Sequence, residues 1–241
     1  RMQVNQLEFH IRLEWGIKGI EVLAPISDVL IIVDILSFST SVDIATSNGA
    51  IVLPYTYKDQ TAQEFATTHQ ALLAQPKRSL STGFTLSPSS LLKISPGTKL
   101  VLPSPNGSTL SLFTSTVPTI CGCLRNAQVV AEYARGYGKN IGIIPAGERW
   151  EDGTLRVACE DLLGAGAILS YLKGKLSPES RLAQIAFTEF KDHLTQKIKG
   201  CGSGKELIAR GFEQDIDLAC AVNSSDNIPI LINNQYHGSN L

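Results

Sequence analysis

The sequence predicts an α/β fold, namely a three-layer α/β/α sandwich with a mixed, mostly parallel sheet and a C-terminal helical portion. Short apolar runs recur along the chain, and stretches with helical spacing separate them. Such alternation is typical of a sheet whose two faces are both covered by helices. After residue 174 the pattern changes to several short helices, which predicts the helical portion.

The expected strands occupy residues 30–34, 50–54, 99–102, 117–121 and 140–145. The expected helices occupy residues 39–48, 59–73, 105–114, 126–137 and 156–173. Asp59 and Asn126 stand where two of these helices begin, and short polar side chains there accept hydrogen bonds from free backbone amides, so we expect both to act as N-caps. Residues 178–220 predict short helices, and the apolar run 228–232 predicts a strand that returns to one edge of the sheet.

Length and charge are those of an ordinary globular protein. A chain of 241 residues can bury a full core, and we expect one domain over residues 1–241, with a change of subdomain near residue 174 left open. The formal net charge of −1 includes no basic excess that would attract nucleic acid or an anionic membrane, and no apolar stretch approaches the length of a membrane span. We therefore expect neither nucleic acid nor a membrane as a partner.

The cysteine content bears on the compartment. Five cysteines, an odd number in a chain of this size, favour reduced thiols and a cytoplasmic location. Cys121 and Cys123 are spaced as a metal-binding pair, but without a second pair they are more typical of buried small apolar residues. A homodimer is the default expectation for an enzyme of this compartment.

Residues 74–98 are rich in Ser, Pro and Gly and lack clear periodicity. A segment of that length without secondary structure is uncommon in a compact domain and is more often a binding loop or a lid than a linker. We therefore expect a binding loop or lid here.

Asp34 ends an apolar run, and Ser37, Ser39 and Thr40 open the helical stretch that follows. In an α/β protein the carboxyl end of a strand is where ligands bind, and the free amides of the next helix favour negative charge. An acid beside an anion site suggests a bound cation. The alternative is that Ser37 or Ser39 only caps the helix and that Asp34 accepts a hydrogen bond from a backbone amide.

Three further polar loops follow expected strands, and parallel strands bring such loops to a common crevice. One contributes Asn106, Gly107 and Ser108, which suit either an oxyanion contact or a simple capped turn. Asn126 and Glu148 occupy the other two loops. We expect Asn106, Ser108 and Asn126 to orient phosphate oxygens, and Glu148 to serve as a reserve acid or ligand.

Charged residues follow the last of these loops. Glu160 and Asp161 open an apolar helix whose small residues allow close packing on the sheet, which would bring both acids near the crevice, although acids there also favour the helix dipole. Arg149 and Arg156 are candidate cations, because a guanidinium binds a phosphate or carboxylate through two hydrogen bonds. Either would neutralise the charge that develops in phosphoryl transfer, and surface ion pairs are the alternative.

Several chemistries are excluded by inspection. The four histidines are scattered without an i, i+4 pair, which argues against a zinc site, and oxygen ligands favour Mg²⁺ instead. Leu36 stands where an aspartyl-phosphate phosphatase needs a second acid, so attack by a metal-bound water is the simpler hypothesis. We assign Asp34 and either Glu160 or Asp161 as metal ligands.

Six segments carry a resemblance when they are taken in order. They are residues 33–40, 48–50, 105–108, 122–127, 145–150 and 160–166, with weaker similarity at 83–88 and 203–207. Together they resemble the motifs of the 2-phosphosulfolactate phosphatase (ComB-type) family. The resemblance implies a magnesium-dependent phosphatase that releases sulfolactate and phosphate from 2-phosphosulfolactate in coenzyme M biosynthesis.

Ser37 departs from that resemblance, because the better-known members have Arg at this position. An Arg that grips an anion supplies a charge-assisted contact, and the sulfonate, carboxylate and phosphate of the substrate all need partners. We therefore expect either a related small phosphorylated hydroxy acid as substrate, or a cation supplied by Arg125, Arg149 or Arg156. Ser203 likewise stands in place of the His of the late motif.

Two other functions stay open. A catalytically altered protein on the same fold could keep the crevice but only bind a small anion or act as a regulatory protein. The Ser at residue 37 favours this function, and the acids at residues 34, 160 and 161 argue against it. A hydrolase with Ser39 or Ser104 as nucleophile would use the same loops, but no Gly-x-Ser-x-Gly elbow supports it.

Overall fold

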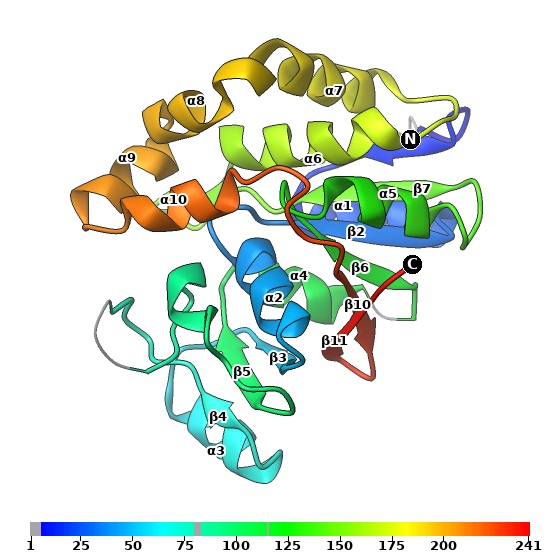
Figure 1. Ribbon diagram of the computed structural model, residues 1–241. Helices are drawn as coiled ribbons and strands as arrows, with labels where there is room; N and C mark the ends of the chain where they lie inside the picture. Colours follow the sequence, from blue (N-terminus) through cyan, green and yellow to red (C-terminus); the bar gives the residue numbers. More distant parts are fainter. Residues whose placement is uncertain (1–5, 80–82, 115) are drawn as a thin grey trace.

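Nine strands of the described part of the chain, which covers residues 6–79, 83–114 and 116–241, form one mixed sheet in the computed structural model (Figure 1). Across the sheet they run in the order β1 (Ile11–Leu13), β7 (Ile141–Pro145), β2 (Val29–Val33), β6 (Thr119–Gly122), β10 (Ile228–Ile232), β11 (Gln235–Ser239), β3 (Ile51–Tyr55), β5 (Lys99–Pro103) and β4 (Leu72–Leu73). The first four strands in this order are parallel to one another, as are the last three, and the antiparallel hairpin of β10 and β11 joins the two groups. The predicted mixed, mostly parallel sheet is confirmed.

Helices cover both faces of this sheet. They are α1 (Gly16–Leu23), α2 (Phe38–Ser47), α3 (Gln60–Thr68), α4 (Gly107–Phe113), α5 (Ala127–Ala134), α6 (Cys159–Tyr171), α7 (Pro178–Phe190), α8 (Leu194–Gly200), α9 (Gly202–Ala209) and α10 (Glu213–Ala219). A separate small hairpin, β8 (Glu148–Arg149) and β9 (Leu155–Arg156), follows β7, and a 3-10 turn, η2 (Pro88–Leu91), precedes β5. Asp59 caps α3 as predicted, because its side chain accepts a hydrogen bond from the Thr61 amide.

The predicted strands before residue 174 are all present, but β1, α1 and β4 were not expected. The helix predicted over residues 59–73 ends at Thr68, since Gln70 adopts a positive φ of 52° that an α-helix does not allow. The apolar pair Leu72–Leu73 then forms β4.

The C-terminal strand lies inside the sheet, so the predicted edge position is wrong. Asn233 and Asn234 have positive φ values of 50° and 60°, as the central residues of a type I′ turn require, and they return the chain as β11. Short ladders pair β10 with β6 and β11 with β3. Tyr236 of β11 is fully buried, and its hydroxyl shares a 2.7 Å hydrogen bond with that of Ser111. The hairpin is therefore part of the core.

Strand β2 is apolar along its whole length because both of its faces are buried. Val29, Ile31 and Val33 pack in a core with α5 and α6. Leu30 and Ile32 point to the opposite face and pack with α1 and α4. A strand buried on both faces needs an apolar side chain at every position.

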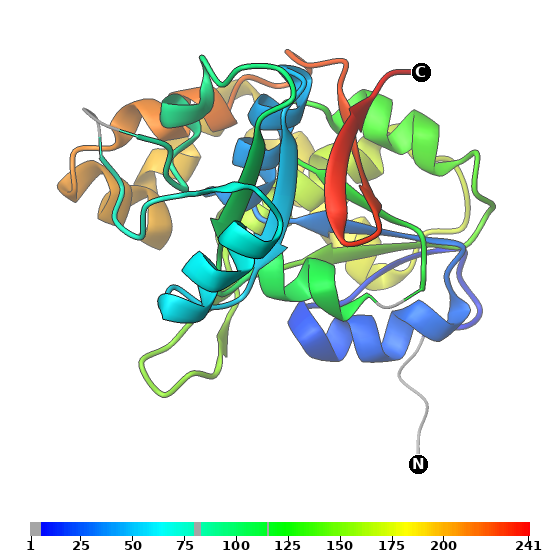
Figure 2. The same ribbon diagram turned by 90° about the horizontal axis from the view of Figure 1, so that it is seen from below.

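The predicted helical portion after residue 174 is present. Helix α7 packs on α6, and α8 to α10 continue toward the far end of the molecule (Figure 1). Both views place α9 and α10, drawn in orange, beside the described parts of residues 74–98 (Figure 2). Asp215 of α10 accepts a 2.7 Å hydrogen bond from Ser87 Oγ, so the two segments are in direct contact. The assignment to a single domain stays a prediction.

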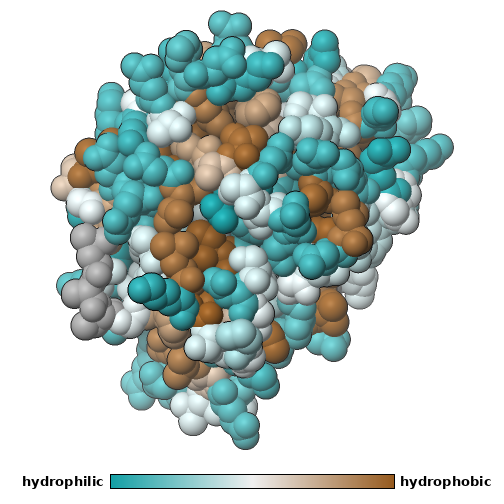
Figure 3. Space-filling view, in the orientation of Figure 1, coloured by the Kyte–Doolittle hydropathy of each residue, from teal (hydrophilic) through white to brown (hydrophobic). Residues whose placement is uncertain are grey.

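In the orientation of Figure 3, hydrophilic residues cover most of the surface and hydrophobic residues show in separate areas. Among the described residues, no helix has the length and apolar character needed to cross a membrane. All five cysteines are free, and Cys121 and Cys123 are buried in the core, as expected of small apolar residues.

The position of the hairpin can be tested by stability. Tyr236→Ala should lower the free energy of unfolding by about 3–5 kcal/mol, because it removes a fully buried ring from the core. Ile232→Ala, on the same hairpin but 49% exposed, should cost about 1 kcal/mol or less. Denaturant unfolding measures both, and a small loss for Tyr236→Ala would contradict a central hairpin.

Candidate active site

Asp34 connects the ends of β2 and β5. Its Oδ2 accepts a 2.9 Å hydrogen bond from the Gly107 amide, at the point where β5 leads into α4. A Cβ atom at residue 107 would lie 2.2 Å from the ring of Phe38, so only glycine allows this close approach. Asp34 thus accepts a hydrogen bond from a backbone amide, which was the alternative expected from the sequence. It also lines a pocket.

Asp161 makes the second connection between strand ends. One carboxylate oxygen accepts a 2.8 Å hydrogen bond from the Ile35 amide and the other a 2.9 Å bond from the Gly147 amide. Helix α6 thereby holds the loops that follow β2 and β7. Together with the contact between Asp34 and Gly107, these bonds bring three of the four predicted loops to a common crevice.

The fourth loop, after β6, turns away from the crevice. Asn126 Oδ1 accepts a hydrogen bond from the Cys123 amide, and its Nδ2 donates to the Asn227 carbonyl, so the structure does not bring it to the pocket. It occupies the N-cap position of α5, but its side chain makes no capping bond, and the predicted cap is wrong. Arg125 in the same loop pairs with buried Asp43 at 2.8 Å.

Three of the predicted hydroxyl groups bond to backbone. Ser39 Oγ accepts a 2.7 Å bond from the Asp34 amide, Thr40 Oγ1 donates to the Ile35 carbonyl, and Ser108 Oγ donates to the Leu102 carbonyl. All three side chains are buried. They stabilise the loops around the site and do not line its pocket, which leaves little support for Ser39 as a nucleophile.

The pocket at the crevice has a volume of about 170 Å³. Of the predicted site residues, it is lined by Asp34, Ser37, Asn106 and Glu148, and Ser104, the alternative nucleophile, lines it too. Its lining also includes Ser203, which the resemblance singled out, and four charged residues that the sequence analysis did not select: Lys58, Arg78, Glu206 and Arg210.

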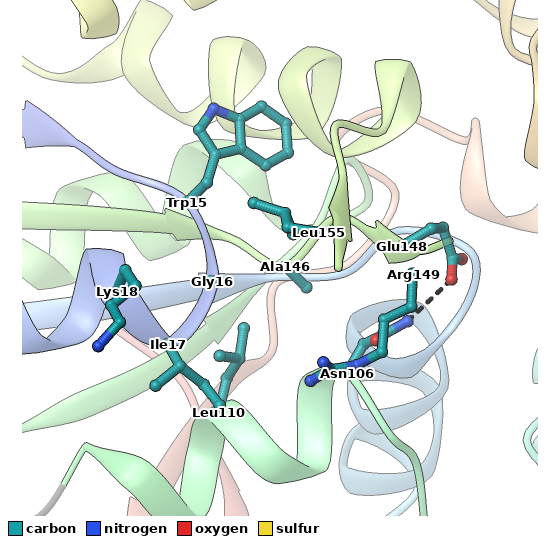
Figure 4. Close-up of a pocket in the computed structure, with 10 residues that line it drawn as sticks. All are labelled: Trp15, Gly16, Ile17, Lys18, Asn106, Leu110, Ala146, Glu148, Arg149 and Leu155. Carbon is teal, nitrogen blue, oxygen red and sulfur yellow. Dashed lines mark hydrogen bonds between the residues drawn. The ribbon is translucent and has the colours of Figure 1, made fainter. Parts of the chain in front are cut away.

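Glu148 and Asn106 also line a second, more apolar pocket, which includes Trp15 and Leu155 (Figure 4). Asn106 Nδ2 donates a 2.9 Å hydrogen bond to Glu148 Oε2, drawn as a dashed line in Figure 4. Arg149 borders this second pocket, and its guanidinium donates to the Gly153 carbonyl of its own hairpin.

Arg156 lies beside the wall of the main pocket. Its Nη2 donates a 3.3 Å hydrogen bond to Ser203 Oγ, and its guanidinium carbon lies 5.7 Å from the ring centre of Trp150. Burial raises the pKa of Glu148, and the positive charge of Arg156 offsets part of that rise, so the two charges interact.

Asp34 and Glu148 are acids of the pocket lining, and Glu160 and Asp161 interact with Asp34 from outside that lining. Burial raises the pKa of Asp34 to about 7, and the charges of Glu148 and Glu160 contribute. Burial likewise raises the pKa of Asp161 well above its ordinary value and that of Glu148, with repulsion between the acids adding to both. A cation near Asp34 and Glu148 would relieve this repulsion.

Cations line the same pocket. Lys58 follows β3, Arg78 lies between β4 and η2, and Arg210 follows α9. Arg78 Nη2 donates a 3.0 Å hydrogen bond to Ser37 Oγ. Arg78, which was not among the cations expected from the sequence, thus lies beside Ser37.

The sequence offered partial signals for these cations. Arg78 falls in the segment expected to be a binding loop, and Lys58 follows a predicted strand. Arg210 lies between two short helices, where no local pattern marks it.

The sequence is similar to those of known proteins. The sequence model of the 2-phosphosulpholactate phosphatase family matches residues 20–234. The 2-phosphosulfolactate phosphatase of Methanothermobacter thermautotrophicus is 25% identical over 204 residues, which cover 85% of this chain and 87% of that protein. Proteins named probable 2-phosphosulfolactate phosphatase from Thermotoga maritima and Thermotoga petrophila are 28% and 27% identical, and each comparison covers 88% of the chain and 94% of the relative.

The raised pKa of Asp34 predicts a stability that depends on pH. The ordinary value is 3.8 and the folded value about 7, so the cost of the buried charge is full above pH 7, shrinks as the pH falls and is absent below about pH 4. In a metal-free buffer, Asp34→Asn should therefore raise the thermal midpoint at about pH 8 and change it little at about pH 4. Asp152→Asn is the control, because its exposed carboxyl has a lowered pKa and should show no such gain.

Glu160 and Asp161 should respond differently to substitution. Asp161→Asn turns an NH₂ group toward one of two buried amide donors, and such a loss costs about 1–3 kcal/mol of unfolding free energy. Glu160→Gln keeps both its shape and the contact with Cys201 Sγ, so its effect should be small. Denaturant unfolding compares the two; equal, mild effects would mean that the pair serves only as negative charge at the start of α6.

Proposed function

The chain belongs to the 2-phosphosulfolactate phosphatase family, and we propose that it hydrolyses 2-phosphosulfolactate, or a related small phosphorylated hydroxy acid, in a magnesium-dependent reaction. As a family member it is a phosphoric monoester hydrolase. The observation that carries the proposal is a pocket lined both by the carboxylates of Asp34 and Glu148 and by cationic side chains. Such a pocket suits a metal ion and a substrate with several negative charges.

The carboxylates of the pocket fit Mg²⁺ in their donor atoms. Among the described residues, no three Asp, Glu, His or Cys side chains stand close enough together to enclose a metal ion. Mg²⁺ does not need such a cage, because it is usually held by one or two carboxylates, by substrate phosphate and by water. Asp34 and Glu148 supply two carboxylates in the pocket, and Glu160 and Asp161, which do not line it, add negative potential.

When bound, Mg²⁺ would supply positive charge for the phosphate oxygens and an activated water as nucleophile. The residues of the chain hold the reactants in place. The Gly107 amide fixes the carboxylate of Asp34, and Asn106 fixes that of Glu148. Arg156, which interacts with Glu148, would offset charge that develops on the phosphoryl group.

A protein that only binds an anion has no use for acids that repel one another beside it. Asp34 and Glu148 both have pKa values raised by burial and by repulsion from neighbouring acids, which favours turnover over the alternative of a binding or regulatory protein. A cytoplasmic location and a homodimer stay predictions.

Turnover with and without Mg²⁺ tests the proposal. Wild-type protein should hydrolyse 2-phosphosulfolactate, and p-nitrophenyl phosphate more slowly, only when Mg²⁺ is present. Loss of a residue that only supports a metal ligand lowers activity by about 10- to 100-fold. Asp34→Asn and Glu148→Gln change the proposed ligands themselves, so each should lower kcat by more than that. Glu151→Gln, an exposed change in the turn between β8 and β9, is the matched control and should keep full activity. Metal-independent turnover would contradict the proposal.

A further inference from the structure

Arg78 is held in a fixed position at the edge of the pocket. Its Nη1 donates a 2.8 Å bond to Asp215 Oδ2 and its Nη2 a 3.0 Å bond to Ser37 Oγ. The side chain of Arg78 is 9% exposed, and that of Asp215 is fully buried. A long side chain held at both ends of its guanidinium loses little further entropy on binding a ligand.

Asp215 fixes the surrounding loop as well as the guanidinium. Besides Arg78, it accepts hydrogen bonds from Ser87 Oγ at 2.7 Å and from the Ser89 amide at 3.3 Å. The ring centre of Phe212 lies 6.0 Å from the guanidinium carbon of Arg78 and 5.9 Å from that of Arg210. Helix α10 and its start thus place the two guanidinium groups on one wall.

This wall carries more positive charge than its own acids offset. Arg78 pairs with Asp215, and Arg210 pairs with the exposed Glu206 at 3.3 Å. In the described part of the chain, no carboxylate lies within ion-pair distance of Lys58. Partial burial of the Lys58 ammonium and repulsion from Arg78 and Arg210 lower its pKa, so the cations are close enough to repel one another. An anion among them would remove that repulsion.

We propose that Lys58, Arg78 and Arg210 form a second anion subsite, which receives the carboxylate or sulfonate of the substrate while the phosphate lies against Asp34 and Glu148. Arg78 is the residue that selects the acid, because its guanidinium is fixed and offers planar donors to two oxygens. The inference rests on the proposed function and gives a reason why the protein would prefer a phosphate ester that carries a second anion. An ester without one leaves this subsite empty.

Substrates that differ in their second anion test the subsite. In Arg78→Gln, kcat/KM for 2-phosphosulfolactate should fall by about 10- to 150-fold, as expected for loss of a hydrogen bond to a charged group. The value for p-nitrophenyl phosphate should stay nearly unchanged. A loss confined to 2-phosphosulfolactate assigns Arg78 to the sulfonate, and an equal loss with 2-phospholactate assigns it to the carboxylate. Arg181→Gln, an exposed change on α7, is the control and should alter neither value.

Inhibition by the two products separates the subsite from the phosphate position. With p-nitrophenyl phosphate as substrate, Arg78→Gln should raise the inhibition constant of sulfolactate and leave that of inorganic phosphate unchanged. If both constants rise equally, or if p-nitrophenyl phosphate turnover falls as much as that of 2-phosphosulfolactate, Arg78 supports the whole site and the inference is overturned.

A rescue variant guards against a merely structural loss. Because Ser37 Oγ lies 3.0 Å from Arg78 Nη2, an Arg at residue 37 reaches the same wall. Ser37→Arg in the Arg78→Gln background should restore part of the preference for 2-phosphosulfolactate, and Arg78→Lys, which keeps the charge without the planar donors, should lie between wild type and Arg78→Gln. Wild-type protein without phosphatase activity would refute the proposed function, whereas an active wild type and an equally selective Arg78→Gln would refute only the subsite.

Discussion

Hydrogen bonds from backbone amides to two buried carboxylates join the loops that form the candidate active site. Asp34 accepts from the loop after β5, and Asp161 accepts from the loops after β2 and β7. Two of the bonds span 73 and 126 residues of sequence and the third, from Gly147 to Asp161, spans 14, so the two acids set the relative positions of the strand ends. The same burial that gives these bonds their strength raises the pKa of both acids, and the protein therefore holds a local electrostatic cost where a metal ion would be bound.

The cationic part of the lining follows the same principle with the opposite sign. Asp215 is a buried carboxylate whose partners are Arg78 and the serines of the 74–98 segment. Both parts of the lining thus depend on an acid that fixes a neighbouring segment. They differ in which charge lines the pocket. Asp34 lines it with its own carboxylate, whereas Asp215 lies behind the lining and holds the guanidinium of Arg78 there. A substrate with a phosphate at one end and a second anion at the other matches that division.

The sequence predicted the parts of this site that local patterns encode. An apolar run that ends in an acid and a Gly that follows a strand both have local signatures, so Asp34 and Gly107 were found and do meet. The hydroxyl of Ser39 was found in the right loop but bonds to backbone, because its orientation depends on packing around α2. Arg78 and Asp215 are separated by 137 positions, and Arg78 lies in an irregular loop. No periodicity in either segment predicts their contact. The central position of β10 was missed for the same reason, as pairing partners distant in sequence leave no local pattern.

Residues 37 and 78 have to be considered as a pair. The family resemblance marks Ser37 as the loss of a cation, whereas the geometry shows the guanidinium of Arg78 donating to that very hydroxyl. A small side chain at residue 37 makes room for Arg78 and accepts one of its hydrogen bonds. An Arg at residue 37 beside an unchanged Arg78 would place two guanidinium groups together on a wall that already contains Lys58 and Arg210, and like charges there repel. The departure at Ser37 is therefore consistent with a cation that has a different origin in the chain, and it does not by itself argue for a different substrate.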